Sequence, residues 1–117
     1  MNQDIIAFVQ ARLDEDADIA RRCDGDGCGR WIADGGTVDF CQYDLDGFHP
    51  TVARHVTRHD PERVLREVAA RQRALNRHVP DTDDTCRHDG RRWPCPDLLD
   101  LAAPHAEHPA FDPGWSL

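Results

Sequence analysis

The chain has 117 residues, of which 39% are hydrophobic, 7% are aromatic and 31% are charged. This length suits one domain, and such a polar composition gives a thin core that usually needs a metal or a disulfide for stability. The formal net charge is −8, from 22 acidic and 14 basic residues. Because phosphate backbones are bound through Lys and Arg, this charge argues against non-specific binding of nucleic acid.

The N-terminal segment and the cysteine content indicate a compartment. The first twenty residues are amphipathic and acidic, without the basic and apolar regions of a secretory signal, and no run of eighteen apolar residues occurs. We therefore expect a cytoplasmic protein without a membrane segment, in which thiols stay reduced. The odd number of cysteines, five, also disfavours a framework made only of disulfides.

In chain order, the first predicted element is a helix within 1–22, where apolar residues recur at steps of three and four. Residues 23–49 begin with a turn rich in Gly and Cys. Three glycines within residues 23–29 favour turn conformations, so we expect the helix to end there. A hairpin around Asp34-Gly35-Gly36 follows, and a polar loop completes this segment.

Residues 50–78 are predicted to form helices, the second of which begins with Asp60 as N-cap and Pro61 at the first helical position. A turn with Cys and His follows at 79–95. The last segment, 96–117, is expected to be a short helix and a tail whose aromatic residues pack back onto the domain. The expected fold is a small, mostly helical α+β single domain with one hairpin, crosslinked by zinc.

Two groups of side chains have the composition of a zinc site, in which four thiolate or imidazole ligands converge from turns. The first group consists of His78, Cys86, His88 and Cys95. The second group consists of Cys23, Cys28, Cys41 and His49. A mixed site with cysteines from both halves is equally allowed by the residues present.

Reduced cysteines can also serve as small hydrophobic residues in a core. Each cysteine of this chain, however, lies in a polar segment rich in turns and none lies on an apolar helical face. We therefore favour a structural zinc ion, which would contribute on the order of 10 kcal/mol to folding.

Two other classes of function are alternatives. His55 and His59 lie four residues apart next to Asp60, which would suit a metal-dependent hydrolase, but the Glu of a metalloprotease helix is missing. Asp60 is better explained as the helix N-cap, so we assign no catalytic residue.

A nucleic-acid-binding regulator would use the Arg-rich third helix, with Arg63, Arg66, Arg71, Arg73 and Arg77. These arginines alternate with Glu62 and Glu67, which favours a solvated helix face. The leading hypothesis is a non-enzymatic interaction module that binds a protein partner.

The whole pattern resembles one family. The stretches "HVTRHDPERVLREVAARQRALNRH" and "PCPDLLDLAAPHAEHPAFDPGW" carry the resemblance, which extends over nearly the whole chain. They resemble domain of unknown function 6221, from high-GC Gram-positive bacteria and their phages. The resemblance implies a zinc ligand set on His78, Cys86 and Cys95, with His88 or Asp89 in place of a second Cys. It implies no activity, and it suggests an accessory protein of a phage or mobile element that acts on a host protein.

Overall fold

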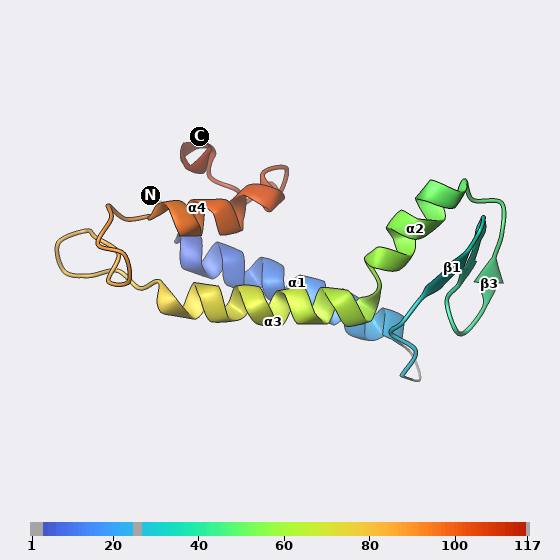
Figure 1. Ribbon diagram of the computed structural model, residues 1–117. Helices are drawn as coiled ribbons and strands as arrows, with labels where there is room; N and C mark the ends of the chain where they lie inside the picture. The colour runs from blue at the N-terminus through green and yellow to red at the C-terminus, as the bar shows by residue number, and fades with distance from the viewer. Residues whose placement is uncertain (1–3, 25–26, 117) are drawn as a thin grey trace. The chain divides into compact units, whose positions relative to one another are not determined.

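The computed structural model describes residues 4–24 and 27–116. The expectations for residues 1–3, 25–26 and 117 therefore lie outside the described residues. In the described residues the helices are α1 (Ile5–Asp24), α2 (Pro50–Arg58), α3 (Pro61–Arg77) and α4 (Pro96–Ala102), followed by the 3-10 turns η1 (Ala103–His105) and η2 (Pro113–Trp115) (Figure 1). The strands are β1 (Ile32–Asp34), β2 (Thr37–Asp39) and β3 (Asp44–Leu45).

The three strands form one antiparallel sheet in the order β1-β2-β3. Ala33 pairs with Val38 and Val38 pairs with Leu45, so the predicted hairpin is present. The third strand lies where the sequence predicted a loop, because a two-residue strand is too short to show alternation of apolar side chains. The α+β fold class is confirmed.

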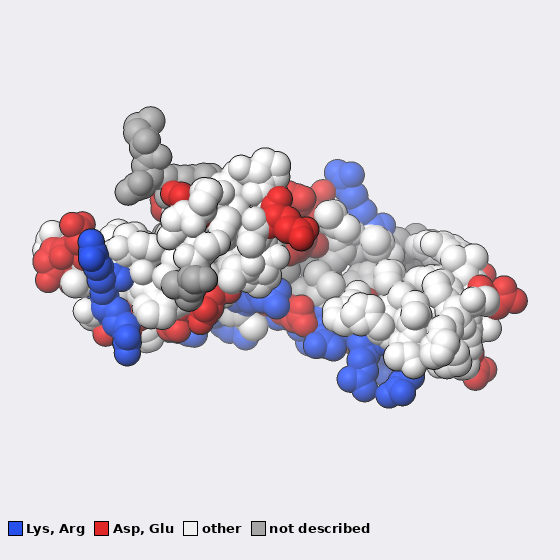
Figure 2. Space-filling view, turned by 90° about the horizontal axis from the view of Figure 1, so that it is seen from above, with Lys and Arg blue, Asp and Glu red and all other residues white. Residues whose placement is uncertain are grey.

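Charged side chains of both signs are spread over the face of the molecule that Figure 2 shows. The net charge of −8 is therefore not gathered into a single acidic patch on that face.

The chain forms two compact units, and the first contains residues 4–14 and 69–116. Phe8 of α1 lies at the centre of its core, with its ring centroid 5.1 Å from that of Trp115 and 5.9 Å from that of Phe111. The tail therefore packs back as expected. The other fully or nearly fully buried residues of this unit are Ile5, Val9, Leu13, Leu75, His78, Cys86, Cys95, Leu98 and Ala102.

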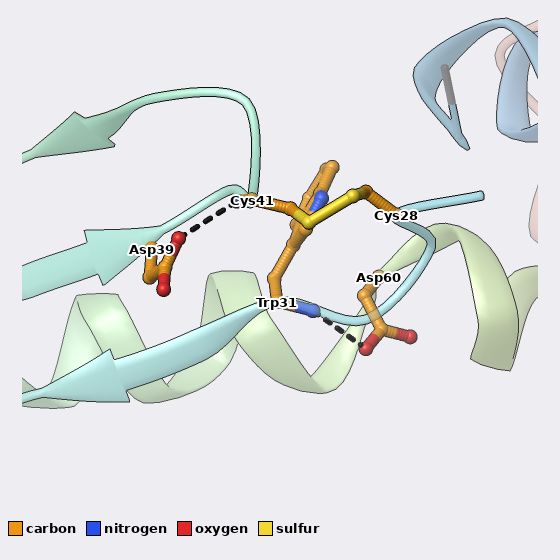
Figure 3. Close-up of a disulfide and its surroundings, with 5 residues drawn as sticks. All are labelled: Cys28, Trp31, Asp39, Cys41 and Asp60. Atoms are coloured by element: carbon orange, nitrogen blue, oxygen red, sulfur yellow. Dashed lines mark hydrogen bonds between the residues drawn. A yellow bond between two sulfur atoms is a disulfide. The ribbon is translucent and has the colours of Figure 1, made fainter. Parts of the chain in front are cut away.

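The second unit contains residues 15–68, in which α2 packs against β1 and β2. Val38 and Ala53 are completely buried between these elements. Gly36 is required at the hairpin, because a β-carbon there would collide with the carbonyl oxygen of Phe48. A disulfide joins Cys28 to Cys41 beside the sheet (Figure 3).

Candidate metal centre

The first side chain of the site, His78, follows the last residue of α3. Its backbone N–H donates to the carbonyl of Leu75 at 3.1 Å, which keeps the chain compact where the helix ends. The imidazole is turned inward, and only 2% of His78 is exposed. An inward-facing histidine at a helix end needs polar partners, because a buried polar group without one is costly.

Cys86 lies in a tight turn of the segment that joins α3 to α4. Its N–H donates to the carbonyl of Arg91 and its carbonyl accepts from the N–H of Gly90, both at 2.7 Å. Gly90 has φ +71, a left-handed conformation that glycine adopts without strain. These two bonds close a turn that brings Asp89 back toward Cys86.

Cys95 is placed by the prolines on both sides of it. Pro96 occupies the first turn of α4, so Cys95 is the N-cap and has an extended backbone with φ −73 and ψ 162. The preceding Trp93–Pro94 peptide bond is cis. The Cys95 side chain points into the interior, where the residue is 0% exposed.

These elements bring four potential ligand atoms together, from His78, Cys86, Asp89 and Cys95. The four atoms all lie within 4.8 Å of one another. The Nδ1 atom of His78 is 3.3 Å from the Sγ atom of Cys86 and 3.3 Å from that of Cys95. Tetrahedral zinc with ordinary bond lengths separates nitrogen and sulfur ligands by roughly 3.5 Å, so the donor set and its spacing fit a zinc ion.

The electrostatic environment of the group differs between its buried and exposed sides. Burial is the main cause that raises the pKa of the Cys95 thiol, to about 11, and the neighbouring Cys86 adds to it. The pKa of Asp89 is lowered, mainly because its Oδ1 accepts a hydrogen bond of 2.9 Å from the N–H of Arg91. The site thus holds two thiols in a buried place and one ionised carboxylate at its exposed edge.

Three residues of the first predicted group therefore lie together in the structure: His78, Cys86 and Cys95. The fourth position is occupied by Asp89 and not by His88. The exposed His88 ring lies edge-on to the ring of His78, with centroids 4.9 Å apart and planes at 76°. It packs on the outside of the site, because consecutive residues of this turn point in different directions.

The second predicted group does not form a site. Cys28 and Cys41 are bonded to each other (Figure 3), so their sulfurs are not free thiolates. Cys23 is an exposed free cysteine. The Nδ1 atom of His49 accepts from the N–H of Thr51 at 3.2 Å, which makes this histidine the N-cap of α2. A mixed site that uses Cys28 or Cys41 is excluded for the same reason, since both are in the disulfide.

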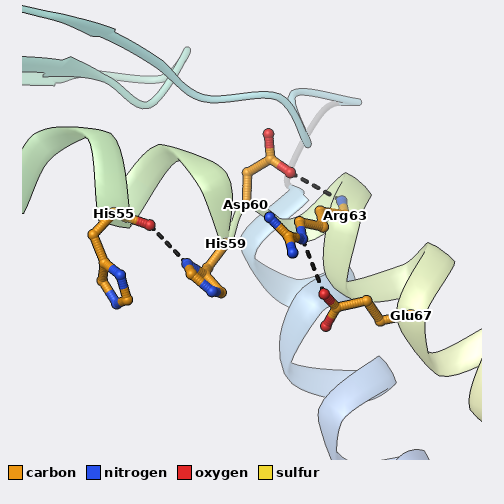
Figure 4. A network of polar contacts seen from close by, with 5 residues as sticks. All are labelled: His55, His59, Asp60, Arg63 and Glu67. Atoms are coloured by element: carbon orange, nitrogen blue, oxygen red, sulfur yellow. Dashed lines mark hydrogen bonds and ion pairs between the residues drawn. The ribbon is translucent and has the colours of Figure 1, made fainter.

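The residues considered for a hydrolase have other partners. Asp60 is only 8% exposed, and its two carboxylate oxygens accept from the N–H of Arg63 at 2.9 Å and from that of Trp31 at 3.2 Å (Figures 3 and 4). The predicted N-cap is therefore confirmed. His59 approaches the carbonyl oxygen of His55 with its Nδ1 atom at 2.7 Å (Figure 4). The three groups do not converge on a common point as metal ligands do.

The arginines of α3 are partly neutralised by glutamates of the same helix. Arg63 pairs with Glu67 at 2.9 Å (Figure 4), and Arg66 pairs with Glu62 at 3.0 Å. This arrangement agrees with a solvated helix face. None of the helices in the described part of the chain has the length and apolar character needed to span a bilayer.

Asp97 was not predicted from the sequence. Its Oδ2 atom lies 3.4 Å from the Nε2 atom of His78, the ring nitrogen on the other side from the two sulfurs. The only sequence signal is its position in the first turn of a helix whose N-cap is a predicted ligand, and this position is also typical of an acid that favours the helix dipole.

In comparisons with known proteins, the model of DUF6221, described as a family of unknown function, matches residues 2–117. No curated protein and no solved structure matches the chain.

Proposed function

The chain belongs to the DUF6221 family, and from this and the geometry above we propose that it is a small, non-enzymatic interaction module built on a structural zinc ion. The observation that carries the proposal is the convergence of the ligand atoms of His78, Cys86, Asp89 and Cys95 within 4.8 Å. Two sulfurs, one imidazole and one carboxylate are ligand types that zinc accepts, and four protein ligands leave no open position for catalysis.

The ligands come from places that the metal would hold together. His78 ends α3, Cys86 and Asp89 lie in the turn of 79–95, and Cys95 begins α4. Few apolar side chains of this segment are buried, so metal binding would contribute much of its stability, on the order of 10 kcal/mol for a structural zinc ion. The metal thereby fixes the path of the chain between the two helices.

The biological setting is part of the proposal. We propose a cytoplasmic protein whose partner is another protein, and, if it is encoded by a phage or mobile element, a protein of the host. Neither alternative function is favoured by an observation: the Asp60 carboxylate is taken up by two backbone N–H groups, and Arg63 and Arg66 of α3 pair with glutamates.

Metal analysis of the purified protein tests the site. We expect about one zinc ion per chain after purification under reducing conditions, and loss of the metal in Cys86→Ser and in Cys95→Ser. Cys23→Ser is the matched control, because Cys23 is an exposed free cysteine outside the group, and it should keep its zinc. Wild-type protein without metal, or a Cys86→Ser protein that still binds it, would refute the proposal.

A second pair of variants identifies the fourth ligand. Asp89→Ala should weaken zinc binding measured by competition with a chelator, whereas His88→Ala should leave it nearly unchanged, because the His88 ring packs outside the group. The opposite order would return the fourth position to His88.

A further inference from the structure

The two ring nitrogens of His78 face different partners. Nδ1 lies 3.3 Å from each of the sulfurs of Cys86 and Cys95, and Nε2 lies 3.4 Å from the carboxylate of Asp97. A neutral imidazole carries its proton on one nitrogen only. A group that accepts a hydrogen bond from this N–H therefore favours the tautomer in which the other nitrogen has the free lone pair. In this site the acceptor is next to Nε2 and the thiols are next to Nδ1.

We propose that Asp97 is a positioning residue of the metal site. Its carboxylate accepts a hydrogen bond from the Nε2–H of His78, which leaves the Nδ1 lone pair free to face the metal. This inference rests on the proposed function, because it concerns the same zinc site. Histidines that bind metals commonly donate their other ring N–H to a carboxylate, which fixes the ring orientation and makes the ligand more basic.

The two side chains of this pair differ in their exposure to solvent, unlike those of an ordinary surface ion pair. The Asp97 side chain is 63% exposed and the His78 side chain only 3%. A carboxylate so open to water contributes little to folding through charge alone. Its contact of 3.4 Å with Nε2 of the buried imidazole would instead act on the metal ligand, because it favours one orientation and one tautomer of the ring.

The surroundings of the pair provide a matched control. A cavity of about 290 Å³ opens beside His78 and is lined by Ala74, Arg77, His78, Asp97, Asp100 and Leu101. Asp97 and Asp100 are both exposed carboxylates on α4 that line this cavity, but Asp97 is the one within 3.4 Å of Nε2. Replacing Asp100 removes the same charge from the same cavity without touching the imidazole contact.

The first test measures zinc affinity by chelator competition in wild-type protein, Asp97→Ala, Asp97→Asn and Asp100→Ala. We expect Asp97→Ala to bind zinc about tenfold to a hundredfold more weakly, as is typical when such an outer partner is lost. Asp97→Asn should lie between, since its amide oxygen still accepts a hydrogen bond, and Asp100→Ala should match the wild type. Equal losses in Asp97→Ala and Asp100→Ala would overturn the inference and leave the zinc site intact.

The second test needs no variant. A long-range proton–nitrogen spectrum of zinc-loaded wild-type protein shows which nitrogen of His78 is bound to the metal. We expect metal-bound Nδ1 and protonated Nε2, with the Nε2 proton protected from exchange. Zinc on Nε2 would overturn the inference alone, and wild-type protein without zinc would overturn it together with the proposed function.

Discussion

Among single residues, Cys95 links metal binding to pH. Its thiol is fully buried, and this burial is the main reason that its pKa is raised above the ordinary value for cysteine, to about 11. A raised pKa means that the metal-free thiol stays protonated throughout the neutral pH range. Zinc binds the thiolate, so it must displace this proton over the whole neutral range.

We therefore expect the apparent zinc affinity to rise with pH by at least tenfold per unit between pH 6 and 8, since at least one proton leaves for each zinc bound. Chelator competition at several pH values, corrected for protonation of the chelator, measures the slope. Calorimetry in two buffers of different ionisation enthalpy counts the released protons independently. An affinity that is constant over this range would contradict the buried, protonated state of Cys95.

The fourth position of the site shows a limit of prediction at this scale. Spacing and residue type predicted His78, Cys86 and Cys95, because a helix end, a turn and a helix start each direct one side chain inward. They pointed to His88 as the fourth ligand, whereas the group in the structure contains its neighbour Asp89, which only the family resemblance had offered. The choice depends on the turn that Gly90 closes by donating to the carbonyl of Cys86, and the residue three after Cys86 is the one that this turn returns to the site.

Among the elements, the start of α3 depends on one buried carboxylate. Asp60 followed by Pro61 predicts the N-cap from the sequence, and the bond from Arg63 N–H at 2.9 Å confirms it. The second bond, from the N–H of Trp31 at 3.2 Å, joins residues that are 29 positions apart. No local pattern predicts such a contact, because it depends on how the segment before β1 passes the helix end.

Asp60→Ala should consequently cost more than the loss of an ordinary cap. We expect a decrease of about 2–3 kcal/mol in the free energy of unfolding, in which the cap contributes about 1 kcal/mol and the unpaired Trp31 N–H contributes the rest. Denaturation by urea measures the difference. Asp112→Ala is the control, since Asp112 caps η2 with one oxygen bound to Gly114 N–H at 2.8 Å and should cost less. Equal costs would show that the bond to Trp31 contributes nothing.

The disulfide between Cys28 and Cys41 was also not predicted from the sequence. The cysteine count and the expected reducing compartment favoured free thiols, and residue spacing alone does not determine which cysteines pair. The pairing depends on the fold, which brings the Cα atoms of the two cysteines to 5.6 Å, within the range that a disulfide bridges.

In the whole molecule, one compact unit contains a disulfide and the other contains the candidate metal site. The disulfide lies in the unit of residues 15–68, and the proposed zinc site lies in the unit that contains residues 69–116. The polar composition predicted that a thin core would need a metal or a disulfide, and the disulfide and the candidate metal site lie in different units. Closing a loop with a separation of 13 residues contributes about 3 kcal/mol by restricting the unfolded chain.

Removing one crosslink at a time should therefore loosen different segments. We expect a chelator to increase amide hydrogen exchange in residues 78–95 and at the start of α4, and to leave β1 and β2 protected. A Cys28→Ser, Cys41→Ser double variant, kept in its zinc-bound form, should show the reverse pattern. We expect each effect to be local because each crosslink would restrain only the segment that it spans. The disulfide spans residues 28–41, and the proposed zinc site spans residues 78–95. Loss of protection in both units after either treatment would contradict this prediction. It would mean that the chain unfolds as one cooperative structure.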